Sequence, residues 1–184
     1  MSGVRQAAAI TGNQVPFVGR PDERAPVPFI PVIVRADTDE TGGTFDVFEF
    51  AAPVGAVRDV TGDGPPPHVH REHEEAFYIL DGQVTFNFGA ETAVAPRGTL
   101  VVVPRGTSHA FRAEAGSRLL VFAIPGGLAG FFEELGAGLA AGRADAEVRS
   151  ALAGKYDTYP VSAPRRQALR RAGRARRQPG CGSN

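Results

Sequence analysis

Residues 64–82 read GPPPHVHREHEEAFYILDG and contain three of the chain's four histidines. His68 and His70 are one residue apart, and alternate side chains of a β-strand point to the same face. Two imidazoles about 7 Å apart on one strand face can bind a single metal ion together. Glu75 opens the next predicted strand and can add a carboxylate. The stretch therefore predicts a metal site built on strands.

The fourth histidine, His109, ends the stretch GTLVVVPRGTSH of residues 98–109. This pattern predicts a strand, then a tight turn at Pro104 and Gly106, and then a ligand. A lone histidine is more often a surface or core residue than a metal ligand. Here, however, chance would have to place every histidine of the chain at metal-ligand spacing. We therefore expect His109 to join the first site.

Three imidazoles and one carboxylate leave one or two positions of a divalent ion open, as in a catalytic site rather than a closed structural one. The set suits Fe, Mn, Ni, Co, Cu or Zn and does not select among them. Such an ion can lower the pKa of an enol or hydroxyl oxygen as a Lewis acid. Glu75 beside the ion can take the released proton as the catalytic base. The predicted metal ligands are His68, His70, Glu75 and His109.

The sequence from Phe29 to Ile124 predicts an all-β domain, either a sandwich or a barrel. Short runs rich in Val, Phe, Ile and Thr alternate with Gly, Pro and Asp, and Asp81-Gly82 is a strong hairpin signal. After Ile124 the apolar period predicts two helices packed outside this domain, the second with its N-cap at Asp145. The predicted strands are Phe29–Val34, Thr44–Ala52, Val69–Arg71, Glu75–Leu80, Gln83–Phe88, Thr92–Val94, Thr99–Val103, His109–Ala113 and Arg118–Ile124.

Composition and charge narrow the class of protein. The chain has 184 residues and a single cysteine, Cys181, which excludes an internal disulfide and a cysteine-based zinc cage. No run is long and apolar enough for a membrane span or a signal peptide, so we expect a cytoplasmic protein. All acidic residues lie at or before Asp157, and seven arginines follow it. An acidic body with a basic tail argues against nucleic-acid binding by the body.

The two histidine stretches resemble the paired motifs of the cupin superfamily, G-x5-H-x-H-x3,4-E-x6-G and G-x5-P-x-G-x2-H-x3-N. The sequence departs from them twice: Gly64 is too close to His68, and Ala113 stands where the family has Asn. Neither departure changes a ligand. The residues that match are His68, His70, Glu75 and Gly82 in the first motif, and Gly98, Pro104, Gly106 and His109 in the second.

The resemblance implies a jelly-roll β-barrel with a metal ion in one mouth. Together with the apolar pattern along the chain, this predicts four segments. These are a partly ordered N-terminal arm (1–25), the barrel (26–125), two short C-terminal helices packed outside it (126–158) and a basic, disordered tail (159–184). The resemblance also implies a homodimer, because single-domain cupins commonly pair their sheets.

Within the cupins, the sequence is most similar to single-domain bacterial quercetin 2,3-dioxygenase-like proteins. That resemblance implies a dioxygenase that uses dioxygen to cleave a flavonol or related enolisable aromatic through a metal-bound enolate. Two alternatives stay open: a cyclase or isomerase that acts on a polyketide-like substrate without dioxygen, and a binding module with a metal but no turnover. A flat aromatic substrate would suit an apolar pocket, for which alternation along the strands predicts Phe77, Ile79, Val84, Phe86 and Phe111.

Two neighbours of the predicted ligands need separate assignment. Glu74 could replace Glu75 as the carboxylate, since the family tolerates three intervening residues after the second histidine. The seven-residue step to Gly82 and the alternation of the strand both favour Glu75. His73 falls in the loop between the ligand strands, so we expect it at the rim or in a turn rather than on the metal.

Overall fold

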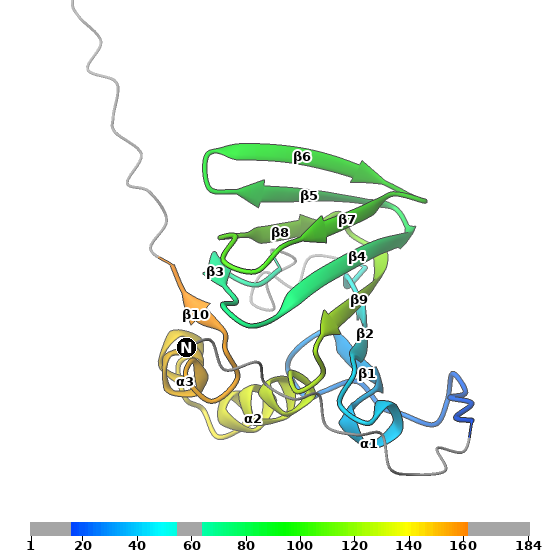
Figure 1. Ribbon diagram of the computed structural model, residues 1–184, viewed down its shortest axis with the longest axis vertical. Helices are drawn as coiled ribbons and strands as arrows, with labels where there is room; N and C mark the ends of the chain where they lie inside the picture. The colour runs from blue at the N-terminus through cyan, green and yellow to red at the C-terminus, as the bar shows by residue number, and fades with distance from the viewer. Residues whose placement is uncertain (1–15, 55–63, 162–184) are drawn as a thin grey trace, which may run out of the picture.

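The computed structural model describes residues 16–54 and 64–161, which fold into two antiparallel sheets and a short pair of strands (Figure 1). The larger sheet has the order β1-β2-β9-β4-β7, and the smaller has the order β6-β5-β8. The pair joins β3 to β10. The bounds are β1 (Val32–Ala36), β2 (Asp46–Ala51), β3 (His68–Val69), β4 (Glu74–Asp81), β5 (Gln83–Phe88), β6 (Glu91–Pro96), β7 (Leu100–Val103), β8 (Ala110–Ala113), β9 (Arg118–Ile124) and β10 (Tyr159–Pro160).

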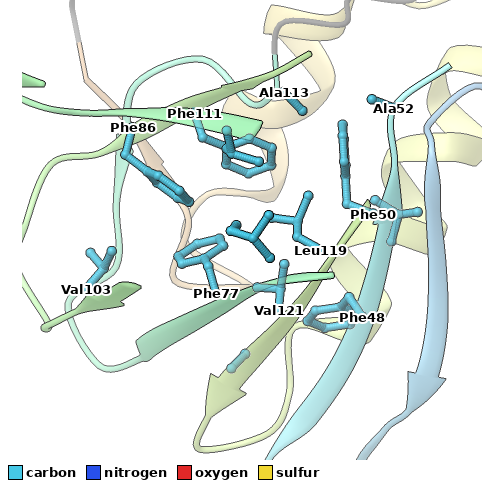
Figure 2. Packing of buried hydrophobic residues seen from close by; sticks show 14 of the residues in the cluster. Phe48, Phe50, Ala52, Phe77, Phe86, Val103, Phe111, Ala113, Leu119 and Val121 are labelled. Atoms are coloured by element: carbon cyan, nitrogen blue, oxygen red, sulfur yellow. The ribbon is translucent and has the colours of Figure 1, made fainter. Parts of the chain in front are cut away.

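The core lies between the two sheets and follows the alternation of their strands. Each strand turns every second side chain inward, so β2 contributes Phe48 and Phe50 and β5 contributes Phe86. Phe77 and Phe111 face these rings, and the ring centroids of Phe77 and Phe111 are 5.8 Å apart. Figure 2 shows these rings directed toward one another around Leu119 and Val121. The all-β fold of antiparallel sheets expected from the sequence is therefore confirmed.

A tight turn at Asp81-Gly82 carries the chain from β4 in the larger sheet to β5 in the smaller one. The hairpin predicted here is wrong, because β4 pairs with β7 and β9, whereas β5 pairs with β6 and β8. Gly82 has φ 73°, which only glycine adopts at little cost. A Cβ at this position would also lie 2.2 Å from Oγ of Ser117. The Asp81-Gly82 signal thus marks a position where both backbone conformation and space require glycine.

Within the described residues, three helices accompany the sheets: α1 (Thr38–Thr41), α2 (Ala129–Ala140) and α3 (Asp145–Leu152). Helices α2 and α3 lie side by side (Figure 1). They pack together through a second small core that includes Phe131, Leu135 and Val148. The N-terminus of α2 is fixed by Asp46 of β2, whose Oδ2 accepts three backbone N–H groups at 2.7–2.9 Å. This bond set ties the helix pair to the larger sheet. None of the helices in the described part of the chain is long and apolar enough to cross a membrane.

The structure corrects several boundaries predicted from the sequence. Tyr159–Pro160 is not part of a tail, because it forms β10 against His68–Val69 of β3. The N-cap of α3 is Ala144, not Asp145, whose carboxylate instead pairs with Arg149 one turn later. The other predicted strands agree with the observed ones to within a few residues. Residues 1–15 of the predicted arm and 162–184 of the predicted tail lie outside the described residues.

Candidate metal centre

Four side chains converge at one mouth of the barrel from three places in the chain. His68 lies on β3 and His70 directly follows that strand, Glu75 lies at the start of β4, and His109 precedes β8. Backbone N–H groups of His68 and His109 donate to each other's carbonyl oxygens at 3.0 and 2.9 Å, which places the two imidazoles side by side. All four side chains are buried, with at most 8% of any residue exposed. Their ligand atoms lie within 4.8 Å of one another.

The carboxylate of Glu75 lies against two of the imidazoles. Its Oε2 is 2.8 Å from Nε2 of His109 and 3.2 Å from Nε2 of His70. The second contact is close but lacks hydrogen-bond geometry, so the buried Nε2 of His70 has no hydrogen-bond partner. A buried nitrogen without a partner is costly, and a metal ion is a partner that would satisfy it.

Each imidazole is oriented by a backbone carbonyl on its other nitrogen. Nδ1 of His68 donates to Pro66 at 2.9 Å, Nδ1 of His70 to Asp157 at 2.8 Å, and Nδ1 of His109 to Thr107 at 3.1 Å. A carbonyl oxygen can only accept, so these bonds assign the proton to Nδ1 in all three rings. Nε2 of each ring therefore faces the cluster, where it can bind a metal ion through its lone pair once any proton it carries is lost. This is the arrangement that orients histidine ligands in metal sites.

Burial and mutual charge set the protonation of the cluster. Burial, with His109 nearby, lowers the pKa of His68 to about 3, so this ring is neutral at physiological pH. Burial also opposes the charged form of His70, but the carboxylate of Glu75 and the bond to Asp157 raise its pKa above the usual value. For Glu75, burial alone would raise the pKa, yet the imidazoles of His109 and His70 hold it well below the usual range. Glu75 is therefore a carboxylate, the form that binds a cation.

This set of donors fits a divalent first-row metal ion. Imidazole nitrogen and carboxylate oxygen bind such ions at about 2.0–2.2 Å, so donors on one ion lie at most about 4.4 Å apart. The ligand atoms lie within 4.8 Å of one another, so at most a small contraction of the side chains is needed. The cluster could thus hold one metal ion with Nε2 of three histidines and a carboxylate of Glu75.

Comparison with known proteins places the cluster within a family. Residues 57–125, which contain all four side chains, match the Cupin_2 family of cupin domains. The chain contains a cupin domain.

Several named proteins are similar to this cupin, and two of their names state different activities. Quercetin 2,3-dioxygenase of Bacillus subtilis (strain 168) is 29% identical over 104 residues, which are 56% of this chain but 29% of that enzyme. This cupin therefore spans less than a third of that relative. The polyketide cyclase RemF of Streptomyces resistomycificus is 28% identical with a TM-score of 0.46, over 60% of this chain and 79% of RemF. KdgF of Halomonas sp. is 20% identical with a TM-score of 0.42, over 52% of this chain and 81% of KdgF.

Glu74 and His73, the sequence neighbours of the predicted ligands, make other contacts in this cupin. The carboxylate of Glu74 is 45% exposed and pairs with Arg105 at 3.2 Å, so it does not reach the histidines. His73 lies in the turn after His70, where its Nδ1 bonds Oδ2 of Asp157 at 2.9 Å. The side chains of His70, His73 and Asp157 also form a second group of possible ligands, but both carboxylate oxygens of Asp157 already accept hydrogen bonds from residues 71–73.

A cavity of about 300 Å³ opens beside the cluster, and His68, His70, Glu75 and His109 form part of its wall. Of the residues predicted to line a pocket, Phe77 and Phe111 do so. The prediction is wrong for Ile79, Val84 and Phe86, which are fully buried in the core and absent from the cavity wall. They do face inward, as the alternation requires, but they lie deeper between the sheets.

The other aromatic walls of the cavity were not predicted from the sequence. These come from strand β2, which was predicted, and from the apolar stripe of α2, which was assigned to packing alone. Arg149 of α3 and Thr158 also line the cavity, and Nε of Arg149 donates to both carboxylate oxygens of Asp145 at 2.9 and 2.8 Å. The missed apolar residues include Phe48, Phe50, Val121, Leu128, Phe131 and Phe132.

Proposed function

We propose that this cupin is a metal-dependent dioxygenase that cleaves an enolisable aromatic substrate such as a flavonol. One observation carries the proposal: a cluster of three histidines and a glutamate forms the wall of a cavity that is otherwise lined mainly by phenylalanine and aliphatic side chains. Such a cavity accepts a flat apolar ring and presents it to the cluster. The 29% identity to a quercetin 2,3-dioxygenase supports the choice of reaction.

His68, His70 and His109 would hold the ion through Nε2, and Glu75 would supply the fourth ligand atom. When bound, a divalent ion supplies Lewis acidity that lowers the pKa of a substrate hydroxyl. Oε2 of Glu75, close to both His70 and His109, would take the proton released from that hydroxyl. Burial of Glu75 keeps bulk water from competing for this proton.

The aromatic side chains would position the substrate ring. Phe50 and Phe111 meet edge to face with centroids 5.2 Å apart, and Phe77 lies 6.0 Å from the ring of His109. An aromatic ligand can add to such edge-to-face contacts, each about 0.5–1.5 kcal/mol beyond the area buried. At the helical end of the cavity, the Arg149–Asp145 pair offers both donors and acceptors to ring hydroxyls.

We also propose that the partner of this chain is a second copy. The outward face of the larger sheet carries two cross-strand rows of apolar side chains over β7, β4 and β9, one of them running Leu100, Tyr78 and Leu120. Leu100 is 60% exposed and Tyr78 is 41% exposed. Contiguous apolar rows on a sheet face are typical of protein interfaces. The second row is Val102, Ala76 and Phe122.

Oxygen uptake tests the reaction. The metal-loaded protein should consume dioxygen with one or more members of a flavonol panel, and the metal-stripped protein should not. Product formation from the same panel under strict anaerobiosis would contradict the dioxygenase and support a cyclase or isomerase. If the loaded protein binds these compounds without turnover in either atmosphere, the binding module is the correct alternative.

A further inference from the structure

Asp157 connects the end of the described chain to the ligand cluster. It lies between α3 and β10, and 9% of the residue is exposed. Its backbone carbonyl accepts the Nδ1 proton of His70 at 2.8 Å, across 87 residues of sequence. One residue from the C-terminal segment therefore orients a predicted metal ligand.

The carboxylate of Asp157 holds the loop that follows the same histidine. Its oxygens accept the backbone N–H groups of Arg71 at 3.0 Å, Glu72 at 2.6 Å and His73 at 3.1 Å. The ring of His73 adds a fourth bond at 2.9 Å. These residues form the connection from His70 to β4, where Glu75 lies, so the carboxylate fixes the path between two of the four ligands.

The backbone of Asp157 is held in the conformation that makes both sets of bonds. Its φ is 51°, a left-handed value that non-glycine residues adopt rarely and Asp and Asn more readily than most. The next residue, Thr158, donates its N–H to Ala153 at 3.0 Å, and β10 pairs with β3 immediately afterwards. The same short segment thus braces β3 on one side and the loop after His70 on the other.

We propose that Asp157 is a positioning residue of the metal centre, acting through His70 and residues 71–73. The inference rests on the proposed metal site. It extends that site to the C-terminal segment: the carbonyl of Asp157 keeps Nε2 of His70 free for the ion, and the carboxylate fixes the spacing between His70 and Glu75.

Asp157→Asn is the informative substitution, because Asn tolerates the left-handed backbone but replaces one accepting oxygen with a donor. Asp46→Asn is the matched control. Asp46 is also buried and also accepts three backbone N–H groups, but they belong to the start of α2 and not to the ligand loop. The full-length proteins are stripped of metal, checked by circular dichroism and thermal unfolding, and titrated with Co²⁺ while the visible absorption is recorded.

Asp157→Asn should weaken Co²⁺ binding about 10–100-fold and change the visible spectrum of the bound ion, as loss of a partner outside the ligand set does. Asp46→Asn should lower the melting temperature and leave the Co²⁺ affinity within about twofold of wild type. Wild-type affinity in Asp157→Asn, or equal weakening in both variants, would overturn the positioning role. If the wild-type protein binds no Co²⁺, the proposed metal site itself is wrong.

A second variant covers a failure of Asp157→Asn to fold. Asp157→Gly removes the carboxylate and accepts a φ of 51° without strain. It should weaken Co²⁺ binding at least as much as Asp157→Asn. A folded Asp157→Gly protein with wild-type affinity would contradict the proposal.

Discussion

Glu75→Gln is the substitution that separates the role of the carboxylate from that of the histidines. Gln keeps the size and one oxygen donor of Glu75, but it loses the charge and the ability to hold a proton. The structure places Oε2 of Glu75 close to the Nε2 atoms of two histidines, so no other carboxylate in the cluster can replace it. A general base typically contributes about 10²–10⁴-fold to the rate. We expect kcat to fall by about this factor in protein that still carries metal on its three histidines.

Glu74→Gln is the matched control one residue away. The carboxylate of Glu74 is half exposed and pairs with Arg105. Such an exposed ion pair contributes about 0–1 kcal/mol to the free energy of unfolding. The control should therefore retain the wild-type rate and nearly the wild-type stability.

The assay is oxygen uptake at saturating substrate, with metal content measured on the same samples. A metal-loaded Glu75→Gln protein that turns over at the wild-type rate would refute the base assignment. If Glu74→Gln were the inactive variant, the register of β4 would be wrong by one residue.

Three further predictions test other parts of the molecule. His109→Ala should sharply reduce metal content by elemental analysis and abolish the rise in melting temperature on metal addition, because the ion binds only the folded state; unchanged metal content would contradict this. Burial would raise the pKa of Glu49, but its bonds to Arg118 and Arg35 hold that pKa below its ordinary value of 4.5. Glu49 therefore stabilises the fold above that pH and loses this effect as the pH falls through its folded pKa. The difference in unfolding free energy between wild type and Glu49→Gln should therefore narrow in urea titrations as the pH falls below 4.5, and a constant difference would show that the charge is not responsible. Leu100→Asp should shift the protein from dimer to monomer in light scattering, because Leu100 lies on the exposed apolar face. If the wild-type protein itself has the mass of a monomer, the proposed dimer interface is wrong.

The sequence was sufficient for the central elements because their signals are local. The spacing of His68 and His70 and the alternation of β4 predicted which side chains share a face, and the structure does bring them together with His109. The turn at Asp81-Gly82 depends on two adjacent residues and was predictable, but the pairing of its flanking strands into a hairpin was wrong, because the two strands belong to different sheets.

The remaining features depend on contacts between distant segments. Strand β10 has two residues and no periodicity, and it exists because it pairs with β3 some 90 positions earlier. Asp157 carries no motif, and its role comes from bonds to the loop after His70. For the cavity, alternation shows which side of the sheet Val84 faces but not its depth along the barrel, so core residues were assigned to the pocket wall.

Anomalous diffraction from crystals grown with Co²⁺ tests the metal centre most directly. The account predicts one strong peak per chain, within bonding distance of Nε2 of His68, His70 and His109 and of a carboxylate oxygen of Glu75. A peak bound instead by His73 and Asp157, or no peak at the mouth of the barrel, would contradict it.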